Sequence, residues 1–179
     1  MLNYEIQPMI IFYIFLLMFF SITGQIMIGN LGVFLPITAT MIFYITVCFG
    51  WQRGMFCAVV SGLLLDILYG TLNQTPLIFL AVCGLAAFWL LYQQVRPASI
   101  NFIPGILTAM ITFLPQMLIK IYDNGWGMYI FNEWLPSMFF VMSFCALFLP
   151  FIIVLCDHFG KSLGLPVYVD AKNQLTIRK

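Results

Sequence analysis

The chain has 179 residues, a formal net charge of +1, 63% hydrophobic residues and only 7% charged residues. Its apolar residues form long blocks instead of one stripe along otherwise polar segments, which excludes a soluble globular fold because such a fold needs polar faces at its surface. We therefore expect an all-α polytopic membrane protein that is surrounded by the lipid bilayer and has no nucleic-acid partner.

The N-terminal residues carry no lysine or arginine, and the apolar run that follows has no small-x-small cleavage pattern, so we expect no removable signal peptide. A crossing needs about 20 apolar residues. On that basis the whole chain, 1–179, forms one domain with six transmembrane helices and a cytoplasmic tail at 157–179. The six predicted spans are residues 9–28, 33–50, 54–73, 76–95, 102–122 and 134–156.

The cations set the expected orientation, because lysine and arginine near the ends of spans stay in the cytoplasm. Arg53 lies between the second and third spans and Arg96 between the fourth and fifth. The other side carries only Lys120. Both termini are therefore expected in the cytoplasm. Four further cations after the sixth span agree with this orientation: Lys161, Lys172, Arg178 and Lys179.

The third span carries a stripe of small residues with one acid. Gly54, Ala58, Gly62, Asp66 and Gly70 recur every four positions, which places them on one face of a helix. Small side chains let helices approach closely in lipid, so this face is expected to be a packing seam. A carboxylate near mid-membrane costs about 2.5–3.5 kcal/mol, so Asp66 must be protonated, hydrogen-bonded or turned toward a wet interior.

Two interpretations of Asp66 stay open, a hydrogen-bond anchor that fixes helix packing and a proton or ion relay. The sequence lacks the chain of titratable groups that a relay needs, which favours the anchor. On the fifth span, Thr108, Thr112, Gln116 and Lys120 recur every four residues, and Gln116 lies at a depth close to that of Asp66. We expect Asp66 to bond to Gln116 or Thr112. Alternatively, this polar face lines a small cavity, or Lys120 extends outward to the membrane surface.

The residues that could support catalysis or metal binding do not form a recognisable set. The five cysteines are dispersed without a CxxC pair, which predicts packing residues instead of a disulfide framework or a zinc site. Asp157 and His158 are neighbours in sequence, so their side chains diverge around a helix at what we expect to be a solvated helix end. We therefore expect no catalytic residues, no enzyme activity, no cofactor and no metal.

The third span and the segment before it carry a family pattern. A proline, Pro36, enters the second span, Arg53 lies in the short loop that follows, and the third span contains Gly62-Leu-Leu-Leu-Asp66 with Gly70 four residues later. This combination resembles the MreD family of rod-shape-determining membrane proteins. The resemblance covers residues 34–90, and elsewhere it rests on hydropathy and length.

The resemblance implies a non-enzymatic scaffold of the bacterial cell-elongation (rod) complex in the cytoplasmic (inner) membrane, supporting cell shape and peptidoglycan synthesis. The implied partners are an MreC-like single-span protein and, through it, MreB, RodA and a class-B penicillin-binding transpeptidase. The implied fold is similar to the substrate-binding subunits of energy-coupling-factor vitamin transporters. The expected helix-packing or partner-binding residues are Gly54, Ala58, Gly62, Asp66, Gly70, Pro36 and Gln116.

The alternative function is that of a substrate-binding subunit of an energy-coupling-factor transporter, which captures a vitamin-like molecule. It needs several convergent polar groups in a pocket. Its family members tend to carry a docking face of alanines on the first span, whereas the first span here contains no alanine. The scaffold is therefore the favoured function.

Overall fold

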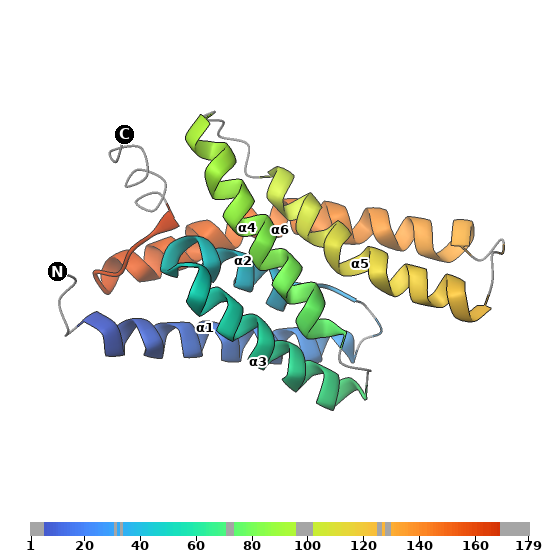
Figure 1. Ribbon diagram of the computed structural model, residues 1–179, viewed down its shortest axis with the longest axis horizontal. Helices are drawn as coiled ribbons and strands as arrows, with labels where there is room; N and C mark the ends of the chain where they lie inside the picture. The colour runs from blue at the N-terminus through green and yellow to red at the C-terminus, as the bar shows by residue number, and fades with distance from the viewer. Residues whose placement is uncertain are drawn as a thin grey trace.

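The computed structural model describes residues 6–30, 32, 34–70, 74–95, 102–124, 127 and 130–168. Within these ranges the chain is helical and contains no β-strand, so the predicted all-α fold is confirmed (Figure 1). A helix lies at each of the six predicted spans. The elements are α1 (Ile6–Gly29), α2 (Ile37–Phe49), α3 (Trp51–Tyr69), α4 (Thr75–Val95), α5 (Phe102–Asn124), the short π-helix η1 (Ile130–Trp134) and α6 (Leu135–Ser162).

Four helices among the described residues, α1, α3, α4 and α6, are long and apolar enough to cross a membrane. Of the other two, helix α2 is shorter than its predicted span. Helix α2 has 13 residues, about 20 Å of helix, against a hydrocarbon core of about 30 Å. Helix α5 has 23 residues, and its described apolar stretch covers Phe102–Leu118. Length and composition therefore support a membrane protein, because these four described helices are each suited to cross the bilayer.

Helix α2 forms the centre of the bundle. All of its residues, from Ile37 to Phe49, are buried, and it contacts α1, α3, α4, α5 and α6. Pro36 stands at its N-cap, and Gly50 ends it with φ at +95°, a backbone conformation that side chains rarely adopt. These two residues explain why the helix is shorter than the predicted span at 33–50.

The directions of the helices bring several chain ends together. Helices α1, α3 and α5 run toward the right of Figure 1, and α6 runs back to the left. The first turn of α3, with Arg53, and the last turn of α6, with Lys161, therefore lie toward the same end of the bundle. The other cations that set the expected orientation lie outside the described residues or have side chains that do: Arg96, Lys120, Lys172, Arg178 and Lys179.

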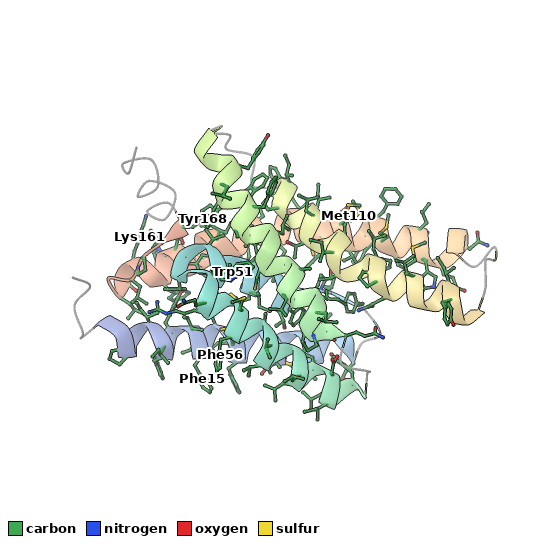
Figure 2. All side chains as sticks on the ribbon, in the orientation of Figure 1. Phe15, Trp51, Phe56, Met110, Lys161 and Tyr168 are labelled. Atoms are coloured by element: carbon green, nitrogen blue, oxygen red, sulfur yellow. The ribbon has the colours of Figure 1, made fainter. Side chains whose placement is uncertain are left out.

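The outside of the bundle is apolar. Large exposed side chains lie on several helices, among them Phe12, Phe15 and Phe19 of α1 and Phe56 of α3. Phe15 and Phe56 lie on the same side of the molecule in Figure 2. Because isolated soluble proteins rarely expose so many large apolar groups, this surface is suited to contact with lipid or with the helices of another membrane protein.

The chain turns back toward the bundle after α6, which continues beyond residue 156, where the sixth span was predicted to end. Gly164 has φ at +68°, and its N–H donates to the carbonyl oxygen of Lys161 at 3.1 Å. The N–H of Leu165 donates to the carbonyl oxygen of Gly160 at 2.9 Å. These two bonds form a Schellman motif, which ends the helix and places Leu165 in the core.

Candidate functional site

The first half of the small-residue stripe packs against α2. A Cβ added to Gly54 would lie 2.9 Å from the Cβ of Thr46 on α2. Ala58, one turn further along α3, has no exposed surface. A larger side chain at position 54 would push the two helices apart, so the close approach agrees with the expected packing seam.

The second half of the stripe receives the N-terminus of α4. A Cβ at Gly62 would lie 2.6 Å from both the backbone nitrogen and the Cα of Pro76. Backbone atoms cannot rotate away as the end of a flexible side chain can. A residue without a side chain at position 62 is therefore what allows the first turn of α4 to lie directly on α3.

This contact brings Thr75, the first residue of α4, to Asp66. The Asp66 side chain is only 2% exposed. Its Oδ2 accepts a hydrogen bond from the backbone N–H of Thr75 at 3.3 Å, and its Oδ1 accepts one from the Thr75 hydroxyl. The first N–H groups of a helix have no partner within the helix, and they carry partial positive charge. Asp66 of α3 therefore caps the N-terminus of α4.

Gly70 completes this arrangement at the end of α3. It adopts the left-handed conformation, with φ at +66°, and its N–H donates to the backbone carbonyl of Asp66. Each residue of the Gly62–Asp66–Gly70 pattern thus has a distinct structural role. Gly62 leaves room for α4, the Asp66 carboxylate binds Thr75, and Gly70 ends α3 so that the chain can turn toward α4.

A second cap of the same kind lies beside the first. Gln25 of α1 is buried, and its Oε1 accepts a hydrogen bond from the backbone N–H of Thr38 at 2.9 Å. Thr38 lies in the first turn of α2, where the N-cap residue Pro36 makes no side-chain capping bond. Because an N–H can only donate, this contact fixes which side of the Gln25 amide carries the oxygen.

Neither Gln25 nor Thr75 was predicted from the sequence as a site residue. A signal for both caps is nevertheless present. In each case a polar side chain lies one turn before the end of an apolar helix, Gln25 before Gly29 and Asp66 before Gly70, and only a short segment precedes the next helix. A polar group so placed can reach back to the N-terminus of the helix that follows.

A cavity of about 500 Å³ lies between the two caps. Gln25, Thr75, Thr112 and Gln116 line it together with Pro36. The polar face of α5 therefore does line a cavity, as one of the alternatives from the sequence stated. The Asp66 carboxylate accepts hydrogen bonds from the first residue of α4, whereas a bond to Gln116 or Thr112 of α5 was expected.

A second cavity of about 580 Å³ adjoins the first. Phe34, Gln116 and Trp134 line both, and Glu133 of η1 lines only the second. The ring of Trp134 packs against that of Phe113 on α5, with 5.4 Å between the ring centroids. Gln116 thus lies at the boundary of the two cavities. A direct contact between Gln116 and Asp66 had been expected.

A buried carboxylate also lies toward the opposite end of the bundle. The Oδ1 of Asp157 accepts hydrogen bonds from the Tyr44 hydroxyl at 3.0 Å and from the backbone N–H of Tyr168 at 2.9 Å. Tyr44 belongs to α2, and Tyr168 follows the turn at the end of α6, so Asp157 joins the returning chain to the central helix. The expectation of a solvated Asp157 is therefore wrong, because residues 165–168 cover it, whereas His158 is exposed.

The cysteines serve as packing residues, as predicted. All five, Cys48, Cys57, Cys83, Cys145 and Cys156, are free and buried. They come from four helices and lie within the apolar core of the bundle. Their burial fits the behaviour of cysteine as a small, polarisable apolar side chain.

No protein-family model, curated protein or solved structure matches the chain. Its function is therefore inferred from its own residues and their contacts.

Proposed function

We propose that this chain is a non-enzymatic scaffold subunit of the bacterial cell-elongation complex, with a role like that of the MreD family. It would lie in the cytoplasmic membrane with both termini in the cytoplasm and bind an MreC-like single-span protein. The observation that carries the proposal is the structural use of Gly62, Asp66 and Gly70. The residues on which the family resemblance rests join α3 to α4 within this chain, so they support a structural role.

The surface of the bundle supports a partner that is itself a membrane helix. Exposed aromatic and aliphatic side chains extend along α1 and α3, and α2 is joined to α3 through Gly50 alone. A partner would therefore contact mainly the sides of the helices. In lipid, such contacts form through van der Waals packing and hydrogen bonds between helices. MreB, RodA and the class-B transpeptidase would associate through this single-span partner.

The test is purification of the tagged chain from bacterial membranes in mild detergent, followed by identification of the bound proteins. An unrelated polytopic protein with the same tag is the control. The proposal expects a single-span protein with a large periplasmic domain in the sample of this chain and not in the control. Recovery of an ATPase module with a bound small molecule would contradict the proposal.

One observation favours the second candidate, a substrate-binding transport subunit with a fold similar to those of energy-coupling-factor transporters. The cavity between the two caps has the size of a ligand pocket, and polar side chains from α1, α4 and α5 line it. The purification just described separates the candidates, because a transport subunit requires an energy-supplying partner and a scaffold does not.

A further inference from the structure

We propose that the cavity between the two caps, here called the cap cavity, binds a small uncharged molecule that carries an amide group on a flat ring. The cap cavity is the space of about 500 Å³ lined by Gln25, Thr75, Thr112, Gln116 and several aromatic rings. Cavities that bury small ligands have volumes of about 300–1,000 Å³. The inference does not rest on the proposed scaffold role, since the chain alone supplies these lining residues.

Some of the polar groups around the cap cavity already form hydrogen bonds within the protein. The donors and acceptors that are left over determine which groups a ligand needs in order to bind. Gln25 uses its oxygen to accept from Thr38, which leaves the amide N–H groups as donors. Thr75 donates its hydroxyl proton to Asp66, so the Thr75 oxygen is left as an acceptor. Asp66 thereby determines that the Thr75 hydroxyl can act toward a ligand only as a hydrogen-bond acceptor.

The groups contributed by α5 complete the pattern. The Thr112 hydroxyl donates to carbonyl oxygens of its own helix, which leaves its oxygen as a second acceptor. Gln116 has no hydrogen bond to another residue in the part of the chain that the structure describes, so its amide can donate and accept. A ligand that matches these walls carries both a carbonyl acceptor and an N–H donor, the combination found in a primary amide or a lactam.

The charge and shape of the cavity walls further restrict the class of ligand that can bind. None of the described residues that line the cap cavity is an aspartate, glutamate, lysine or arginine. A charged ligand would lose part of its hydration without gaining an ionic partner among these lining residues, and this loss costs free energy. Phe34, Phe79 and Trp134 contribute aromatic rings to the walls, and these favour a flat ring in the ligand.

Three molecules of nearly equal shape test the inference: benzamide, which is neutral, benzoate, which is anionic, and benzamidinium, which is cationic. The purified chain in detergent is titrated with each at constant ionic strength, and its unfolding temperature and tryptophan fluorescence are recorded. We expect a saturable rise in unfolding temperature and a saturable fluorescence change with benzamide only, because a ligand that binds the folded state stabilises it.

Two variants then locate the site. Gln116→Leu is expected to weaken benzamide binding about tenfold, the effect of losing one or two hydrogen bonds to the ligand. Gln52→Leu makes the same chemical change at an exposed position in the first turn of α3 and is expected to leave binding unchanged. If Gln116→Leu does not fold, Thr112→Val is the second variant, since it removes an acceptor at nearly constant size.

Three results would overturn the inference. They are similar binding of all three molecules, no saturable effect of any of them, and equal weakening of benzamide binding by the variants at positions 116 and 52. The first would indicate partition into the detergent or unspecific apolar contact. None of these outcomes bears on the scaffold proposal, which depends on the protein that co-purifies with the chain.

Discussion

The carboxylate of Asp66 on α3 binds Thr75, the first residue of α4, through both its backbone N–H and its hydroxyl. Gln25 of α1 binds the backbone N–H of Thr38 in the first turn of α2. The helix pairs α1–α2 and α3–α4 are therefore closed in the same way. A polar side chain near the end of one helix satisfies a backbone N–H at the N-terminus of the next.

The cap on α2 gives a first prediction. Gln25→Leu leaves the buried N–H of Thr38 without its acceptor, and an unsatisfied buried donor costs about 1–3 kcal/mol. We expect a lower unfolding temperature in detergent for this variant. Gln52→Leu, an identical change at an exposed position, should behave as wild type. Equal stability of the two variants would show that the contact between Gln25 and Thr38 does not support α2.

The contact between α3 and α4 gives a second prediction. Gly62→Ala places a Cβ 2.6 Å from backbone atoms of Pro76, so the helices must separate, with an expected loss of about 1–3 kcal/mol in stability. Gly84→Ala on α4 is the matched control because a Cβ there meets no atom within 4 Å. The control should be neutral or more stable, since alanine favours a helix over glycine by about 1 kcal/mol. Thermal unfolding of both variants measures the difference, and a stable Gly62→Ala would contradict the close contact.

The carboxylate toward the other end of the bundle gives a third prediction. Tyr44→Phe removes the hydroxyl that donates to Asp157, and a hydrogen bond to a charged group contributes about 1.5–3 kcal/mol. We expect a lower unfolding temperature and faster proteolysis of the segment after Gly164, because Asp157 also holds Tyr168. Tyr122→Phe, at a side chain that is 90% exposed, is the control. Unchanged proteolysis in Tyr44→Phe would mean that the returning segment is held by other contacts.

The helices could be predicted from the sequence because each is a block of apolar residues bounded by polar, glycine or proline residues. The four-residue spacing of Gly54, Ala58 and Gly62 also predicted a face of close helix contact. Which helices meet that face could not be predicted, because the pattern of α3 says nothing about α2 or α4. The length of α2 was overestimated for a related reason, since a buried central helix and a membrane-spanning helix are equally apolar.

Thr75 was not predicted as a partner of Asp66, because depth in the membrane was the only available guide. Equal depth on parallel helices favoured Gln116, whereas a contact between Gly62 and Pro76 brings Thr75 to the carboxylate. That contact leaves no periodic signal in the sequence. The burial of Asp157 was missed in the same way, because it depends on the chain returning into the bundle after α6.

Asp66 caps the N-terminus of α4 through its bonds to Thr75. This role is tested by comparing the unfolding temperatures of wild type, Asp66→Asn and Asp66→Leu in detergent. The carboxylate accepts from Thr75 through two oxygens, whereas asparagine has one. Asparagine can accept from the Thr75 N–H through that oxygen and donate its amide N–H to the Thr75 hydroxyl, so the change removes the attraction between charge and helix dipole, about 0.3–2 kcal/mol. Leucine leaves the N–H and hydroxyl of Thr75 without that acceptor, at about 1–3 kcal/mol for each buried group.

If Asp66 caps α4, Asp66→Asn unfolds close to wild type and Asp66→Leu unfolds at a clearly lower temperature. An Asp66→Leu protein as stable as wild type would refute the cap. So would an Asp66→Asn protein as unstable as Asp66→Leu, since the carboxylate charge would then matter and hydrogen-bond acceptance would not.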